Sequence, residues 1–154
     1  MIRGISCKIN KLWGDVFKQI VGEINLKKYT WKVVDGYIDV YNIERLQEKT
    51  IFDKDLISGE EFMDFIKTEN DYNPYLFSIQ GSLKKFFKVV SKYYEYKKSP
   101  VEIIIMITDS EWLDIYSKDI DIIKTIEKNL INNKNFYDIE LITDENDSRT
   151  SFKL

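Results

Sequence analysis

The chain has 154 residues, the length of one domain, and its 44% hydrophobic and 32% charged residues exclude intrinsic disorder. The net charge of −3 is uneven, because residues 1–34 carry seven bases and two acids while residues 101–154 carry six bases and twelve acids. This asymmetry argues against a protein that coats DNA and predicts a basic face opposite an acidic one. We predict a single globular domain over residues 1–154, with 144–154 as a polar C-terminal tail.

Cysteine content and the lack of long apolar runs predict the compartment. Cys7 is the only cysteine, so no intrachain disulfide can form. The longest aliphatic run, residues 103–107, is far too short to cross a membrane. We expect a soluble, cytoplasmic protein with no membrane partner, in which Cys7 is a small buried hydrophobe rather than a nucleophile.

The N-terminal part predicts a strand, a helix and a hairpin. Residues 2–9 alternate in the manner of a strand, and Asn10 precedes apolar residues that recur at helical spacing over 12–24. Two β-rich runs within residues 29–43 are separated by Asp35-Gly36. An Asp-Gly pair between such runs is typical of a two-residue hairpin turn.

The next segments are less uniform. Residues 44–57 predict no definite element, whereas residues 58–61 (Ser-Gly-Glu-Glu) form a capping box that predicts the start of a short helix. Residues 75–80 predict a strand. Pro74 and Pro100 each stand just before an apolar run, which predicts junctions between loop and strand.

The C-terminal part gives the clearest pattern. Residues 101–108 are almost wholly aliphatic and predict a strand buried on both faces at the middle of a sheet. Residues 112–116 predict a short strand, Asp119 predicts the cap of a helix that ends near residue 131, and residues 136–143 predict the last strand. The whole order predicts an α+β fold, with a mixed, mostly antiparallel sheet and about three helices packed on it.

Two strands end in the same tripeptide, Ile-Thr-Asp, and acidic residues follow each copy. If the strands were parallel, their carboxylates would meet at one end of the sheet, where they could bind Mg²⁺ or Ca²⁺. The favoured alternative is that these acids cap turns and are solvated. Arg149 would form an ion pair that ties the tail to the body, or else bind an anion. The candidate binding residues are Asp109, Glu111, Trp112, Asp144, Glu145, Asp147 and Arg149, and whether any metal binds stays open.

The sequence lacks the residues and motifs that are most often found in catalytic sites. The chain has no histidine, which removes the commonest general base and every Ser-His or Cys-His system. No Ser-x-x-Lys motif and no glycine-rich phosphate loop is present. We therefore predict no catalytic residue and no cofactor.

Residues 83–98 combine lysines with aromatic rings. Their helical period is ambiguous, and a break near Ser91 followed by a short helix is favoured. Bases and rings together would suit single-stranded nucleic acid over residues 84–98. An amphipathic element with lysines in water and rings in the core is favoured, so nucleic acid is not the expected partner.

Short motifs at both ends resemble those of a known family. These are Arg3-Gly4-Ile5-Ser6, Asp109-Ser110 with Ile115-Tyr116-x-Lys118-Asp119, and the stretch from Ile139 to Thr150. They resemble a family of short, uncharacterised proteins of low-GC Gram-positive bacteria, known as a domain of unknown function. The resemblance implies a single bacterial cytosolic domain and brings no activity with it.

Two classes of function stay open. The favoured one is a non-catalytic protein-interaction module, of the immunity or antitoxin-like kind, because catalytic motifs are lacking and Tyr and Trp commonly anchor interfaces. The alternative is a metal-dependent phosphoesterase, with Asp109, Glu111, Asp144 and Asp147 as ligands and Arg149 or a lysine as the charge clamp. The partner and the oligomeric state are left open.

Overall fold

A computed structural model of the chain describes residues 1–10, 16–42, 45–50, 52, 54–67, 72–147 and 149–154. Its strands form one sheet, in which each described pairing is antiparallel. The elements are β1 (Ile2–Ile9), α1 (Val16–Val21), β2 (Thr30–Asn42), β3 (Arg45–Thr50), β4 (Leu56–Ile57), α2 (Gly59–Lys67), β5 (Tyr72–Ser82), α3 (Tyr93–Lys98), β6 (Val101–Thr108), β7 (Trp112–Ser117), α4 (Ile120–Ile131) and β8 (Phe136–Thr143). The predicted α+β class with a mostly antiparallel sheet is confirmed.

The sheet runs in the order β3-β2-β5-β6-β7-β1-β8, and β4 pairs with β2 outside this path. The aliphatic strand β6 therefore lies at the centre, as its sequence predicts. Ile103, Ile105 and Ile107 enter one hydrophobic core, whereas Ile104 and Met106 enter another. This alternation follows from the two-residue period of a strand, and the sheet accordingly has a core on each face.

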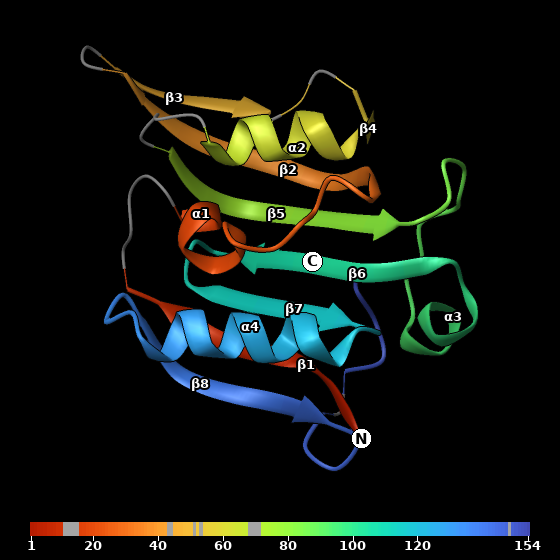
Figure 1. Cartoon of the computed structure of the whole chain (residues 1–154). Helices are drawn as coiled ribbons and strands as arrows, with labels where there is room; N and C mark the ends of the chain where they lie inside the picture. The colour runs from red at the N-terminus through yellow and green to blue at the C-terminus, as the bar shows by residue number, and fades with distance from the viewer. Residues whose placement is uncertain (11–15, 43–44, 51, 53, 68–71, 148) are drawn as a thin grey trace.

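One face of the sheet is covered by three helices, α1, α2 and α4 (Figure 1). Their apolar sides and the facing strand residues form the first core, in which Trp31 and Phe17 are fully buried. The Trp31 and Phe62 ring centroids are 4.7 Å apart, and the Phe17 and Phe77 centroids are also 4.7 Å apart. Aromatic residues thus supply much of the packing that holds the helices on the sheet.

The second face is covered by α3, the irregular segment before it and the last residues of the chain. Phe152 of the tail is buried in this second core, where it packs on Tyr96 and Tyr116. Backbone hydrogen bonds join the two covering segments, from Phe152 N to Ser91 O at 2.9 Å and from Tyr93 N to Thr150 O at 3.0 Å. The tail is therefore an integral part of the second core.

The caps predicted at Ser58 and Asp119 are confirmed. Ser58 N donates to Glu61 Oε2 at 2.7 Å and Glu61 N donates to Ser58 Oγ at 3.1 Å, which is the reciprocal capping box. Asp119 Oδ1 accepts a hydrogen bond from Asp121 N at the start of α4. The break predicted near Ser91 is also confirmed, because α3 begins at Tyr93.

Three local predictions are wrong. Asp35-Gly36 forms no hairpin but lies within the continuous strand β2, beside a register shift between Val33 and Asp35 that absorbs the irregularity. Pro74 lies inside β5, next to a second register shift, where a missing N–H costs little. Helix α1 ends at Val21 rather than at residue 24, and the part predicted over residues 11–15 lies outside the described residues.

Among the helices of the described residues, none has the length and apolar character needed to cross a membrane.

Candidate functional site

The hairpin between β6 and β7 holds three of the predicted site residues. Asp109 and Ser110 have positive φ angles of 54° and 59°, as both central residues of a type I′ turn require. Glu111 N donates to Thr108 O at 3.1 Å and closes the turn. Asp109 and Glu111 are exposed and Trp112, the first residue of β7, is 46% exposed, so this hairpin presents two acids followed by an aromatic ring.

Strand pairing continues this surface across the sheet. Trp112 pairs with Lys8 of β1, and Lys8 pairs with Tyr137 of β8, so the three side chains share one row. The Lys8 ammonium lies 4.6 Å from the Trp112 ring centroid and 5.9 Å from that of Tyr137. Tyr137 is 42% exposed. The lysine thus holds two exposed rings side by side by cation–π attraction.

Acidic residues surround this row. Asp138 has a φ of 51° and its carboxylate lies 3.5 Å from Lys8 Nζ. An open groove of about 560 Å³ runs beside the row, and its walls include Ser6, Lys8, Trp112, Asp138 and Glu140. We call Lys8, Trp112, Tyr137 and Asp138 the Trp112 patch. Its single lysine is neutralised by Asp138, so the acids on the hairpin and on β8 give this region a negative charge.

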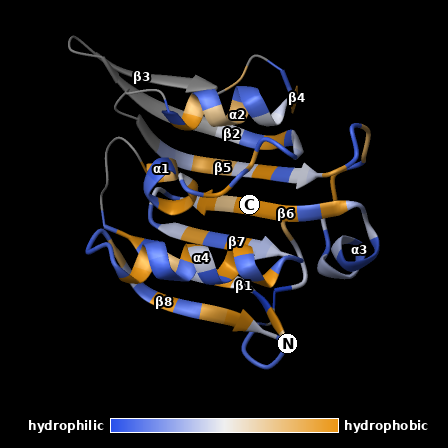
Figure 2. Cartoon of the chain, in the orientation of Figure 1, coloured by the Kyte–Doolittle hydropathy of each residue, from blue (hydrophilic) through white to orange (hydrophobic). Residues whose placement is uncertain are grey.

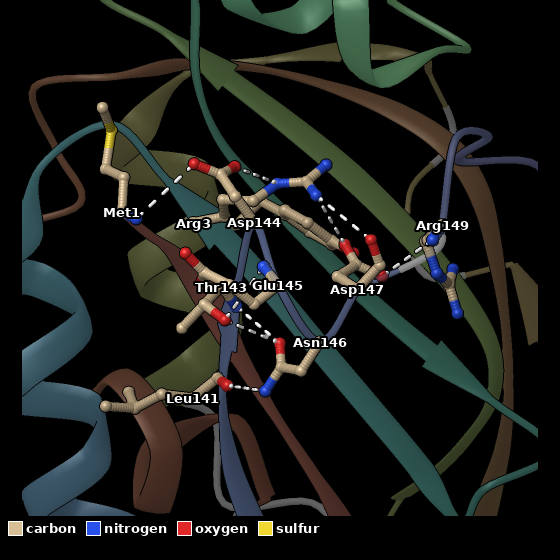
Figure 3. A network of polar contacts seen from close by, with 10 residues as sticks. Met1, Arg3, Leu141, Thr143, Asp144, Glu145, Asn146, Asp147 and Arg149 are labelled. Carbon is tan, nitrogen blue, oxygen red and sulfur yellow. Dashed lines mark hydrogen bonds and ion pairs between the residues drawn. The ribbon is translucent and has the colours of Figure 1, made fainter.

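The remaining predicted residues lie in the loop after β8 and on the tail (Figure 3). Arg3 of β1, only 8% exposed, lies between Asp144 and Asp147. Its Nε is 3.7 Å from Asp144 Oδ1 and its Nη1 is 3.5 Å from Asp147 Oδ2. The guanidinium also stacks 3.3 Å above the Tyr93 ring centroid. This buried cation therefore fixes the loop and α3 to the same strand.

Asn146 shapes the same loop. It accepts a hydrogen bond from Thr143 N at 2.7 Å and donates to Leu141 O at 2.8 Å. The backbone N–H of the exposed Glu145 donates to Thr143 Oγ1, and a hydrogen bond with the Thr143 side chain lowers the pKa of the Glu145 carboxyl. These contacts are those of turn-forming residues. Asp147, by contrast, is 13% exposed and paired with Arg3, so it is not the solvated acid that the favoured interpretation predicts.

Arg149 ties the tail to β7. Its Nη2 lies 3.0 Å from Asp114 Oδ2, and its backbone N–H donates to Asp147 Oδ1 at 2.9 Å. The Tyr116 hydroxyl donates to the other oxygen of Asp147 at 2.9 Å. These groups border a cavity of about 140 Å³. Arg149 therefore makes the structural ion pair predicted for it, with Asp114 as its partner.

Burial controls the titration of this cluster. It raises the pKa of the Asp114 carboxyl above the usual value, an effect that Arg149 opposes and the Asp147 charge adds to. Burial and the hydrogen bond to Asp147 also raise the pKa of the Tyr116 hydroxyl. On β1, burial raises the pKa of the Cys7 thiol to about 12, with a smaller contribution from Asp114. Cys7 is thus the buried, unreactive residue that its sequence context predicts.

The two groups of acids do not converge. Strands β6 and β8 run in opposite directions, because β7 and β1 lie between them and each pairing is antiparallel. Glu111 O accepts from Ile9 N and Asp144 N donates to Met1 O, so the groups lie at opposite ends of β1, roughly 25 Å apart. No cluster of three or more acidic or cysteine side chains able to hold a metal occurs among the described residues. The condition under which the carboxylates would meet, a parallel arrangement of the two strands, is therefore not met.

Lys8, Tyr137 and Asp138 were missed as site residues. The sequence carries a weak signal for them, because Tyr137 and Ile139 alternate with the acids Asp138 and Glu140. Such a pattern is compatible with a partly exposed strand at the edge of the sheet. What the sequence could not supply was the register that sets Lys8 between Tyr137 and Trp112.

The fold and this surface define a single-sheet α+β protein with an exposed aromatic and acidic patch. The chain belongs to the family described as "Protein of unknown function (DUF2691)", which it matches over residues 2–153. It is also 28% identical, over 151 residues and 98% of each chain, to the "Uncharacterized protein YncE" of Bacillus subtilis (strain 168). These findings confirm the resemblance drawn from the sequence motifs. No solved structure matches the chain.

Proposed function

We propose that this protein is a non-catalytic protein-interaction module, of the immunity or antitoxin-like kind, which binds a partner protein through the Trp112 patch. The observation that carries the proposal is the exposed Trp112 ring, held beside Tyr137 by Lys8 on a rigid sheet. Tryptophan and tyrosine are the side chains that most often anchor interfaces, and they cost little entropy when a sheet already fixes them.

The charge around the patch supports a partner with a basic surface. Asp109 and Glu111 precede Trp112 on the hairpin, and Glu140 lines the same groove as Trp112. Carboxylates at the rim of an interface steer a cationic partner and raise the rate of association more than the final affinity. We also propose the cytoplasm as the location, since the free thiol of Cys7 suits a reducing compartment.

We do not propose a metal-dependent phosphoesterase, because the carboxylates that would bind its metal lie at opposite ends of β1. The proposal is tested by capture of the tagged chain from its native host, with identification and stoichiometry of what elutes. Trp112→Ala and Tyr137→Ala should each lower the affinity for the captured partner by at least about thirtyfold, the effect of losing a hot spot.

A matched control is available in Tyr94→Ala, which makes the same substitution at a tyrosine that is 57% exposed on α3, at the far end of the molecule. It should leave the affinity unchanged. Absence of any stoichiometric protein partner, or equal retention of the partner by the Trp112 and Tyr137 variants, would contradict the proposal.

A further inference from the structure

A second exposed surface lies at the other end of the sheet, on residues 83–98, which we call the lysine segment. Four of its apolar side chains are largely in water: Leu83 is 61% exposed, Phe86 76%, Val89 46% and Tyr94 57%. Figure 2 shows hydrophobic and hydrophilic residues alternating in the loop between β5 and α3. Exposed apolar side chains gathered in one short segment are a common feature of binding surfaces.

The segment is held in place. Phe87 is buried in the second core, and the Gln80 side chain makes two hydrogen bonds with the Val90 backbone, at 2.7 and 2.8 Å. Lys92 forms an antiparallel bridge with Ser151 of the tail. Phe86 is therefore exposed on a clamped loop, and its exposure does not reflect local unfolding.

The same segment is strongly basic. It contains six lysines and one acid, Glu95, whose carboxylate accepts the backbone N–H groups of Ser91 and Lys92, both at 3.1 Å. None of the six lysines forms an ion pair with a carboxylate of the described residues. The lysines are Lys84, Lys85, Lys88, Lys92, Lys97 and Lys98.

Strand register brings more lysines to this end. Thr30 pairs with Ser82, so Lys27 and Lys28, which precede β2, lie at the same end of the sheet as the start of the lysine segment. Lys32 lies 5.4 Å from the Phe87 ring centroid. A protein with a net charge of −3 thus carries one concentrated basic and apolar surface, far from the Trp112 patch.

We propose that the lysine segment docks this protein on anionic phospholipid surfaces, with Phe86 and its apolar neighbours in the interfacial layer and the lysines on the headgroup phosphates. Clustered lysines are attracted to anionic leaflets, and exposed apolar side chains add burial at the headgroup boundary. The sequence predicts no membrane partner, because no apolar segment is long enough to span the bilayer. Docking on the membrane surface needs no such segment.

The chemistry of the segment favours lipid over nucleic acid. Leu83 and Val89 have no ring face on which a base could stack, whereas the acyl boundary accepts them. All six cations are lysines, which act as point charges, and the segment contains no arginine for bidentate phosphate or base contacts.

The test is cosedimentation of the full chain with vesicles of phosphatidylcholine alone or with about 30% phosphatidylglycerol, at low salt and at roughly 0.5 M salt. Binding should need the anionic lipid and weaken at high salt. Phe86→Ser should lower the partition coefficient about tenfold, through lost apolar burial. Lys84→Glu with Lys85→Glu should lower it by more than about tenfold at low salt.

The matched control is Lys124→Glu with Lys128→Glu, which makes the same charge change at exposed positions of α4, on the other face of the sheet. It should bind vesicles like the unmodified protein. Failure to bind anionic vesicles, or equal loss in the control, would overturn the proposal. Tighter binding of a single-stranded oligonucleotide than of vesicles, abolished by Lys84→Glu with Lys85→Glu, would overturn it in favour of nucleic acid.

Discussion

Removing the Phe152 ring tests whether the tail is part of the folded core. The ring is 3% exposed, and its centroid lies 5.0 Å from that of Tyr116, 5.9 Å from that of Tyr96 and 6.3 Å from that of Tyr93. Burying a phenyl group contributes about 1.5–3 kcal/mol, and each edge contact between rings adds about 0.5 kcal/mol or more. Phe152→Ala should therefore lower the free energy of unfolding by about 3 kcal/mol.

The measurement is urea unfolding followed by tryptophan fluorescence. With a slope of about 2 kcal/mol per molar urea, the midpoint should fall by about 1.5 M. The control is Phe86→Ala, the same substitution at a ring that is 76% exposed, which should change the free energy by less than about 0.5 kcal/mol. A loss below about 1 kcal/mol for Phe152→Ala would refute the packing of the tail against the sheet.

Three further predictions concern Asp114, Ser110 and Cys7. Burial raises the folded-state pKa of Asp114, so its carboxyl stabilises the fold most when neutral, and that contribution is lost as the pH rises from the unfolded value through the raised one. As the pH rises from 4 to 7, the free energy of unfolding of Asp114→Asn, measured with urea, should thus increase relative to that of the unmodified protein. A decrease relative to the unmodified protein would contradict the burial of the Asp114 carboxyl. Ser110→Gly should raise the free energy of unfolding by about 0.5–1 kcal/mol, because φ is 59° there, and an unchanged urea midpoint would contradict the strained turn. The Cys7 thiol, with its pKa raised to about 12, should react with a disulfide reagent at pH 8 at least about a hundredfold more slowly folded than unfolded, and similar rates would disprove its burial.

Local patterns predicted the elements that depend on neighbouring residues. Ser58 and Glu61 are three residues apart and bond each other, so a capping box can be recognised without knowing the fold. The central place of β6 was also predictable, because a strand aliphatic on both faces must be covered on both. The predicted Asp35-Gly36 turn does not form because β5 pairs with β2 from Thr30 to Val40, and this pairing outweighs a local turn preference.

The candidate site was harder to predict, because it depends on strand order. Asp109, Glu111 and Trp112 were identified as neighbours in sequence, and the structure keeps them together on one hairpin. Their relation to Asp144 and Asp147 depends on the number of strands between β6 and β8, which no residue pattern specifies. Lys8 joins the patch only because β1 lies between β7 and β8.

The position of β1 also has a consequence for how the protein is made. This strand is synthesised well before both of its neighbours, β7 and β8, which come from residues 112–143. Until the ribosome has translated β7 and β8, β1 has no strand to pair with, and Arg3 lacks its carboxylates until Asp144 and Asp147 have followed. Strand pairings between residues far apart in the sequence form slowly, and unpaired strand edges are prone to aggregate before they do. We therefore expect chaperones to protect β1 in the nascent chain until β7 and β8 have been synthesised.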